Sequence, residues 1–210
     1  GRPCEDLFPE QLFVPLQMES SGFGEPWSDG LVNQPWGHVQ QGQRFVPHDP
    51  DPAGFGGISF GMPYGDMVHS SVADLAKYGV YHLRGDMGLE KSLTTATFHR
   101  LHHAPPQRAA PDQEIASSGF FNAGRVDSEG RWTTVHHWGY FARGRTLWWF
   151  SPQADVGAVI LTNGTDTDET RGMRPILEIL RELDQRYRSD PAGTTAPRES
   201  DRQRASPAIE

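Results

Sequence analysis

Residues 131–163 read RWTTVHHWGYFARGRTLWWFSPQADVGAVILTN, and this stretch decides the fold class. The segments 131–136 and 146–150 are strand-like, and 156–162 is apolar almost throughout. A period of two is typical of a strand with one buried face, and a short apolar run bounded by turns is typical of a strand covered on both faces. The turn Ser151-Pro152-Gln153-Ala154-Asp155 separates the last two segments. The stretch therefore predicts consecutive antiparallel strands.

The flanking sequence extends this pattern on both sides. Residues 120–126 predict a further strand, which the hairpin turn Asp127-Ser128-Glu129-Gly130 joins to the next one. On the C-terminal side, Pro175 suits the first turn of a helix. The apolar stripe of that helix consists of Ile176, Leu177, Leu180, Leu183 and Tyr187. We expect it to pack on the sheet.

Helices are also predicted before the strands. Ser71-Val72-Ala73-Asp74 begins a helix whose Ser hydroxyl and Asp carboxylate can accept bonds from free backbone amides, and Gly85 can end it. A shorter helix is expected over 95–104, with Pro105-Pro106 as its stop, and a helical turn within 7–16 ends at Pro15. Residues 22–65 hold too much Gly, Pro, Asp and Asn for regular elements and predict a long ordered loop.

These elements define an α+β fold class: an antiparallel β-sheet with a C-terminal helix plus a loop and helix region. We expect a loop-rich and helical region over 1–117, which ends in a polar linker, and the sheet with its helix over 118–188 of the same domain. Residues 189–210 carry almost no apolar side chain, so they cannot offset the entropy of ordering and predict a disordered tail.

Composition narrows the classes of function. The chain has 210 residues and a formal charge of −8, with Lys and Arg scattered through it, so nucleic acid is not an expected partner. No segment approaches the roughly 20 apolar residues that cross a bilayer, and no membrane span is expected. The single cysteine, Cys4, cannot form an internal disulfide, and the compartment stays open.

His137-Trp138-Gly139 is followed by Pro152 and then by Val159-Ile160-Leu161-Thr162-Asn163. This order resembles the serine β-lactamase and penicillin-binding-protein superfamily, near class C β-lactamases and related peptidases and esterases. Those proteins carry Lys-Thr-Gly or His-x-Gly on an edge strand, then a turn with Pro, then an apolar strand ending in Thr-Asn. Three further stretches are similar to family segments: Phe13-Val14-Pro15-Leu16-Gln17-Met18, in which Gln17 replaces a Gly, Gly37-His38, and Val68 to Ala76.

The resemblance implies an acyl-serine mechanism on amide or ester bonds, with no cofactor and no metal. It implies a catalytic role for His137 and Gly139, in which His137 holds a substrate carboxylate or carbonyl and the strand backbone helps form an oxyanion hole. Trp138, Tyr140 and His38 become candidate substrate-binding residues. The alternative for His137 is a strand-end histidine with an ordinary structural partner. The substrate, whether β-lactam, D-peptide or ester, stays open.

The same resemblance calls for Ser-x-x-Lys, which this chain lacks. Its only lysines are Lys77 and Lys91, and the residues three positions before them are Asp74 and Gly88. Since the family places this motif before the segment that Phe13 begins, we expect the chain to be the C-terminal part of a hydrolase. Its expected partner is then the missing N-terminal half of the domain, and the isolated chain is expected to be inactive.

A different class of enzyme is suggested by Gly57-Ile58-Ser59-Phe60-Gly61, which matches the Gly-x-Ser-x-Gly nucleophile elbow of α/β-hydrolases. That elbow needs an apolar strand before it and a helix after it. Here 48–52 and 62–65 are rich in Pro, Gly and Asp, so neither element is predicted. A tight glycine loop is the alternative interpretation of Ser59.

Two further patterns have ordinary explanations. His99, His102 and His103 could share a helix face and bind zinc, although the HExxH pattern is absent and a solvated helix end is the favoured interpretation. The aromatic run 148–150 could be a ligand platform, but alternation in a buried strand explains it as core.

A non-catalytic binding module that uses the aromatic loops and His137 remains a third hypothesis for the function of the chain.

Overall fold

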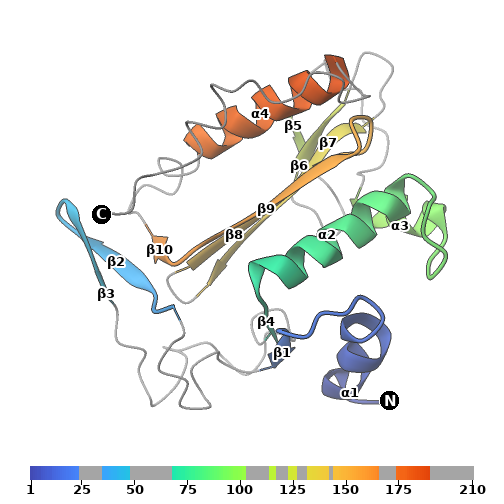
Figure 1. The fold of residues 1–210 in the computed structure, drawn as a ribbon, viewed down its shortest axis with the longest axis horizontal. Coiled ribbons are helices and arrows are strands. Elements are labelled where there is room, and N and C mark those ends of the chain that lie inside the picture. The colour runs from blue at the N-terminus through green and yellow to red at the C-terminus, as the bar shows by residue number, and fades with distance from the viewer. Residues whose placement is uncertain are drawn as a thin grey trace, which may run out of the picture.

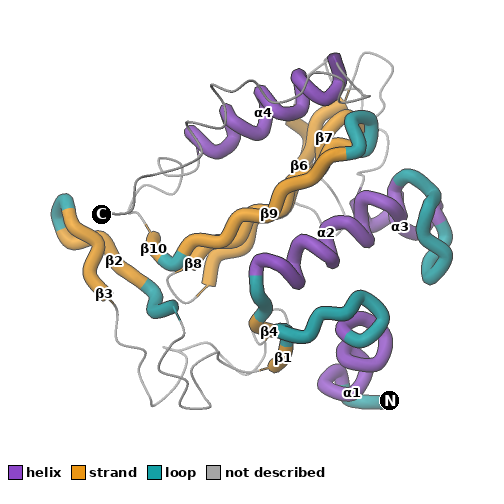
Figure 2. Tube along the Cα trace, viewed as in Figure 1, coloured by secondary structure: helices purple, strands orange, loops and turns teal. Residues whose placement is uncertain are grey.

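The computed structural model describes residues 1–23, 35–47, 68–102, 114–116, 123–126, 132–141, 144–165 and 174–189. A sheet lies between two helical layers, with α4 (Arg174–Ser189) on one side and α2 (Val72–Asp86) on the other (Figure 1). In Figure 2 the orange strands of this sheet run between the two purple helices. None of the helices in the described ranges is long and apolar enough to cross a membrane.

The main sheet is an antiparallel meander of five strands in sequence order. The strands are β5 (Glu114–Ala116), β6 (Ala123–Val126), β7 (Trp132–Phe141), β8 (Gly144–Ser151) and β9 (Val156–Thr162). Each strand pairs with the next one along the chain, and the register shifts between Arg125 and Val126. The α+β class and the antiparallel sheet predicted from the sequence are confirmed.

β8 supplies the core on both faces of the sheet. Trp148 and Phe150, 6% and 3% exposed, pack with Leu83 of α2. Leu147 and Trp149 alternate with them and pack with Leu180 of α4 on the other side. Fully burying each such side chain stabilises the fold by roughly 1.5–3 kcal/mol, so β8 contributes the densest part of the core. The side chains of residues 147–150 therefore alternate between the two faces of the sheet and pack against the helix on each face.

α4 is tied to the sheet by one arginine as well as by its apolar stripe. Arg188 donates to Asp184 Oδ1 at 2.8 Å, to the Thr133 carbonyl at 3.0 Å and to Gln153 Oε1 at 3.2 Å. These bonds reach β7 and the turn after β8, so they fix the last turn of the helix. The predicted packing of this helix is confirmed.

α2 begins as the sequence predicts. Ser71 is the N-cap, and its hydroxyl accepts a bond from the Asp74 amide at 3.2 Å. The Asp74 carboxylate turns away from the helix instead of capping it. The helix continues through Gly85 to Asp86, and the left-handed residue that follows is Gly88, with φ of 75°. The expectation that Gly85 ends the helix is therefore wrong.

Gly85 serves a close contact with α3 (Thr95–His102). A Cβ built at Gly85 would lie 2.4 Å from the ring of Phe98, a side chain that is completely buried. Only a residue without a side chain lets the two helices approach this closely. The shorter predicted helix is confirmed, and its Phe98 faces inward as expected.

The N-terminal segment folds back onto the start of α2. It comprises α1 (Cys4–Phe8), a π-helical turn (Pro9–Phe13) and β1 (Gly22–Phe23), which pairs with β4 (Val68–His69). The rings of Phe8, Phe13 and Phe23 pack at centroid distances of 5.5–6.2 Å. Helical structure ends before Pro15, as predicted, but begins earlier than residue 7.

Asp74 anchors this segment. Its carboxylate is 2% exposed and accepts bonds from the Ser20 amide at 2.7 Å, from Ser21 Oγ at 3.0 Å and from Lys77 Nζ at 2.8 Å. Lys77 also donates to the Gln17 carbonyl. Burial alone would raise the pKa of Asp74, but these bonds outweigh it and lower the pKa below its usual value.

Gln17 stands where the resembled family segment has a glycine, and its backbone conformation is one that glycine adopts without strain. Its φ of 57° lies in the left-handed region, where a residue with a Cβ is strained by roughly 1 kcal/mol and glycine is not. A glycine at this position is thus what the backbone itself favours. The chain retains the conformation while carrying a glutamine.

Two expectations about irregular segments are wrong. Within the predicted long loop, β2 (His38–Gln41) and β3 (Arg44–Pro47) form a hairpin, and Gly42 with φ of 63° makes its turn. β10 (Gly164–Thr165) adds to β2 in parallel. In the predicted polar linker, β5 joins the main sheet. Such short strands depend on partners distant in sequence, which local composition does not reveal.

Substitution of two glycines of α2 by alanine should have opposite effects. We expect Gly85→Ala to lower the free energy of unfolding by about 1–3 kcal/mol, because its Cβ forces the Phe98 ring or the helix to move. Gly79→Ala should raise it by up to about 1 kcal/mol, since that Cβ meets Val159 at an ordinary 3.6 Å and alanine favours the helix. Urea unfolding followed by circular dichroism measures both changes. If the two substitutions changed the free energy of unfolding in the same direction, this would contradict the close helix contact.

Removal of the Asp74 carboxylate should free the N-terminal segment. We expect Asp74→Ala to lower the free energy of unfolding by about 1–3 kcal/mol at pH 7, because buried donors lose their acceptor. The pKa of Asp74 is lowered in the fold, so this stabilisation is complete above the unfolded value near ~3.9 and is lost as the pH falls below it. The difference between wild type and variant should therefore shrink near pH 3.

The control for this experiment is Glu10→Ala. Glu10 pairs with Arg2 at 2.7 Å, but both side chains are at least half exposed. We expect no measurable change, because water already solvates both charges. An equal loss in the two variants would refute the anchoring role of Asp74.

Candidate functional site

The His-x-Gly triplet lies within β7 and not at its end. β7 runs on to Phe141, and β8 pairs with it throughout this part. Opposite His137 stands Trp148, opposite Gly139 stands Thr146, and Tyr140 lies in register with Arg145. The triplet is therefore held by a continuous ladder, which gives its backbone a fixed geometry.

Strand alternation divides the triplet between the two faces of the sheet. His137 and Gly139 share a face with Val135, which is completely buried in the cluster beneath α2. Trp138 lies on the other face, where it packs into the cluster beneath α4. Its ring lies edge-on to His136 at a centroid distance of 5.9 Å. This geometry gives Trp138 a packing role, on the opposite face from His137.

β7 lies between strands β6 and β8 in the main sheet. The described pairing of β6 with β7 runs from Trp132 to His136, which is the residue before the triplet. On the other side, the pairing with β8 continues to Phe141. Gly139 has no side chain, and Thr146 is its nearest neighbour, 3.6 Å from the position of a Cβ. Among the described residues, the side chain that approaches Gly139 is thus that of Thr146.

His38 is brought to the end of β9. Its amide donates to the Asn163 carbonyl at 2.7 Å, and its Nδ1 lies 2.9 Å from the Trp36 carbonyl. The Asn163 side chain donates to the same Trp36 carbonyl at 3.2 Å. Because Thr162, Arg145 and Tyr140 lie in register across the sheet, this is also the end of the sheet at which Tyr140 lies. The Gly-His and Thr-Asn segments therefore meet in space.

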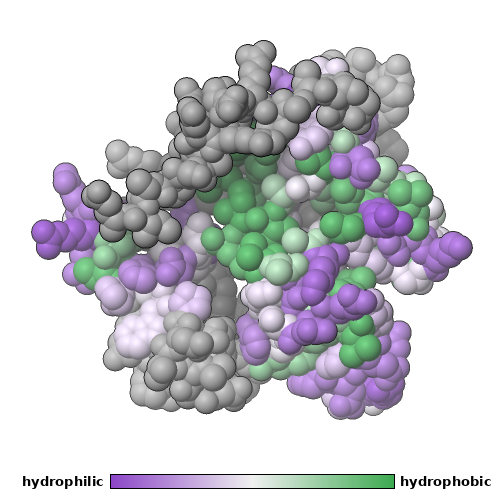
Figure 3. Space-filling model, in the orientation of Figure 1, coloured by the Kyte–Doolittle hydropathy of each residue, from purple (hydrophilic) through white to green (hydrophobic). Residues whose placement is uncertain are grey.

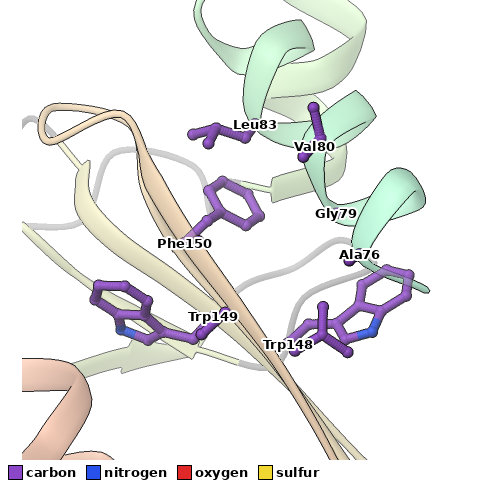
Figure 4. A pocket seen from close by; sticks show the side chains of 10 residues that line it. Ala76, Gly79, Val80, Leu83, Trp148, Trp149 and Phe150 are labelled. Carbon is purple, nitrogen blue, oxygen red and sulfur yellow. The ribbon is translucent and has the colours of Figure 1, made fainter. Parts of the chain in front are cut away.

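An apolar cleft of about 100 Å³ lies on the same face of the sheet as His137, between α2 and strands β8 and β9. Figure 4 shows Trp148 and Phe150 pointing toward α2, while Trp149 points to the other side of β8. Apolar atoms gather over the middle of the sheet in Figure 3. The residues lining the cleft are Ala76, Gly79, Val80, Leu83, Trp148, Trp149, Phe150, Gly157, Ala158 and Val159. None of them is titratable, so the cleft itself offers no acid or base.

The histidines of α3 are not a solvated helix end. His102 is completely buried, its Nδ1 lies 2.9 Å from Asp86 Oδ1, and its Nε2 lies 2.8 Å from Nδ1 of His82. His99 Nε2 lies 3.0 Å from the Asp86 carbonyl. Among the described residues no group of three His, Cys, Asp or Glu side chains could hold a metal ion. His103 lies outside those residues.

This buried cluster was missed by the sequence interpretation. Asp86 and His82 stand four positions apart on α2, a spacing that places two side chains on one helix face, and this signal was available. Burial is the main cause that lowers the pKa of His82 to about 3, and the neighbouring His102 lowers it further. The Asp86 carboxylate acts in the opposite direction and raises it. His82 is thus neutral in the fold at ordinary pH.

Other predicted features lie elsewhere. Ser59 and its glycine loop fall outside the described residues, as does the predicted disordered tail from 190 onward. The aromatic run of β8 is core on both faces, which confirms the packing interpretation over a ligand platform. Thr146, the neighbour of Gly139, was not singled out from the sequence, because only the register of β7 and β8 brings it there.

Comparison with known proteins agrees with this geometry. A family model described as Beta-lactamase matches residues 1–181. The solved structure of an octameric penicillin-binding protein homologue from Pyrococcus abyssi is similar in fold, with a TM-score of 0.57 at 19% sequence identity. The similarity covers 85% of this chain and 37% of that one, so the chain spans little more than a third of that relative. No curated protein matches.

The family model thus spans most of the 210 residues, including the Pro-Leu-Gln-Met segment, the α2 segment and the His-x-Gly strand. The fold of the solved relative has the same mixture of helices and antiparallel sheet. This chain belongs to the β-lactamase family of serine-hydrolase-type proteins.

Proposed function

We propose that this chain forms the sheet side of the catalytic cleft of a β-lactamase-like serine hydrolase that acts on amide or ester bonds. One observation carries the proposal: His137 and Gly139 share the α2 face of β7, where pairing with β8 holds their backbone in a continuous strand. Family membership supports it, because the family match spans the triplet, and the triplet resembles the His-x-Gly motif of that family.

The geometry suggests how β7 would serve the reaction. An extended substrate lying along the second half of β7 can exchange backbone hydrogen bonds with it, as an added strand does. A backbone N–H group of this strand would then help stabilise the oxyanion that forms when serine attacks the carbonyl. His137 would hold the carboxylate or carbonyl of the substrate, and Gly139 would leave room for it.

The nucleophile in this proposal lies outside the 210 residues. The chain has no Ser-x-x-Lys, and Lys77 is already bound to the Asp74 carboxylate and to the Gln17 carbonyl. That lysine is committed to anchoring the N-terminal segment and is poorly suited to deprotonating a serine. We therefore propose that a separate segment supplies the serine and lysine and closes the cleft from the α2 side.

Substrate contacts follow from the same arrangement. Tyr140 and His38 lie toward one end of the sheet, beyond the triplet, and are proposed to contact the part of the substrate that extends past His137. Trp138 would act from the opposite face by holding β7 against α4. The His-x-Gly form of the triplet favours a peptide or ester over a β-lactam, by family resemblance.

Treatment of the folded chain with a fluorophosphonate should leave its intact mass unchanged. This reagent labels serines that a neighbouring base activates, and the proposal places no such serine in these residues. Intact-mass spectrometry of folded and heat-denatured samples makes the comparison, with Ser59→Ala as the matched control. A single adduct found only in the folded wild type, and lost in the control, would replace the proposal with a hydrolase that uses Ser59.

Substitution of His137 should impair the form of the protein that includes the Ser-x-x-Lys segment. We expect His137→Ala to lower kcat/KM about 10²–10³-fold, the loss typical of removing one group that stabilises the transition state. His137→Lys should restore most of the activity, because lysine holds the corresponding position in related proteins.

The control for this substitution is His69→Asn on β4, which pairs with β1 away from the triplet. Its kcat/KM should stay within twofold of wild type. Steady-state kinetics with a nitrophenyl ester, a D-alanyl anilide and a chromogenic β-lactam measure all variants and identify the substrate class. Wild-type kinetics in His137→Ala on every substrate turned over would contradict the proposed role.

A further inference from the structure

We propose that the chain of hydrogen bonds from Asp86 through His102 to His82 is a pH-sensitive latch that holds α3 against α2 and releases it when both rings become charged. The latch is separate from the proposed catalytic cleft and does not depend on that function. It rests on the arrangement of three buried polar side chains at the junction of two helices.

The three side chains form a linear chain with very little access to water. Asp86 Oδ1 lies 2.9 Å from His102 Nδ1, and His102 Nε2 lies 2.8 Å from His82 Nδ1. Exposed fractions are 8% for Asp86, 0% for His102 and 4% for His82. α2 contributes the two ends and α3 contributes the middle, so the chain bridges the helices.

The geometry limits how many protons the chain can hold. A hydrogen bond between two ring nitrogens contains a single proton, since one nitrogen must donate and the other accept. One imidazolium is compatible with this bond and is balanced by the Asp86 carboxylate. If both rings were charged, both facing nitrogens would carry protons and the 2.8 Å contact between them would become repulsive. A second proton therefore breaks the bridge.

The described residues around the two rings are mostly aromatic. Apart from the chain itself, α2 presents Tyr78 and Tyr81, whose rings lie 4.4 and 5.3 Å from that of His82. α3 presents Phe98 and His99, and His99 contacts Asp86. Burial, with Tyr81 second, raises the pKa of the Tyr78 hydroxyl, which thus stays neutral.

The sheet adds aromatic rings to the cluster. Phe150 lies edge-on to His102 at 5.2 Å, and Trp148 lies 6.2 Å from His82, both as ring-centroid distances. His137 stands opposite Trp148 on the same face of the sheet. β9 (Val156–Thr162) carries no titratable side chain. Within the described parts of α2, α3, β7, β8 and β9, Asp86 contributes a carboxylate to this cluster and lies at hydrogen-bond distance from His102.

The sign of the pH effect follows from His82. The fold lowers the pKa of His82 to about 3, chiefly by burial, whereas an unfolded histidine titrates near ~6.5. The latch is therefore fully closed above about pH 6.5 and weakens as the pH falls from there toward the folded value. Opening lets His82 take up the proton that the closed latch excludes, so between about pH 6 and pH 4 this proton should raise the open fraction almost tenfold for each pH unit.

The test is hydrogen exchange of the α3 amides, residues 95–102, in the 210-residue chain between pH 4.5 and pH 7. After correction for the intrinsic rate, we expect the opening constant of wild type to rise almost tenfold per pH unit below pH 6. In His82→Asn this dependence should largely vanish, because an amide replaces Nδ1 as a donor or acceptor without titrating. His69→Asn, a histidine substitution outside the latch, should retain the wild-type slope.

Equal slopes in wild type and His82→Asn would overturn the proposal. A second measurement on wild type keeps it testable if His82→Asn does not fold. Nitrogen-15 NMR of the histidine rings should show His82 neutral at pH 5. Titration of His82 near pH 6.5 with α3 still protected would equally overturn the latch.

Discussion

The fold depends on β8, whose consecutive side chains are buried in opposite directions. Trp148 and Phe150 hold α2, while Leu147 and Trp149 hold α4, so one strand supports two helical layers. β7 derives its position from the same strand, because it pairs with β8 from Val135 to Phe141. The orientation of His137 is thus a consequence of packing on β8, and a change of register by one residue would turn it to the wrong face.

Both helical layers are completed by polar contacts at their ends. Asp74 ties the N-terminal segment to the start of α2, and Asp86 ties α3 to its end. At the far side, Arg188 joins α4 to the Thr133 carbonyl. In each case a charged group is mostly buried yet satisfied by several partners, which makes these contacts costly to break. The apolar core sets the layers, and these contacts set where each helix begins and ends.

Much of the fold follows from the sequence, and the site follows in part. The start of the helix at Ser71, the strand at 156–162 and the apolar stripe of the last helix were predicted correctly, because capping and periodicity are local properties. The β2–β3 hairpin and β5 were missed, since short strands form only beside partners elsewhere in the chain. The His-x-Gly triplet was recognised by its spacing, and its roles remain predictions.

The sequence by itself determined the main helices and the longer strands of the sheet, the family resemblance and the absence of Ser-x-x-Lys from these residues. Tertiary structure decided which neighbours meet. It separated Trp138 from His137 by strand alternation, joined His38 to Asn163, and buried His102 between Asp86 and His82. The physical reason is that helix capping and hydrophobic periodicity depend on a few consecutive residues, whereas burial, strand pairing and charge pairing depend on segments that only folding brings together.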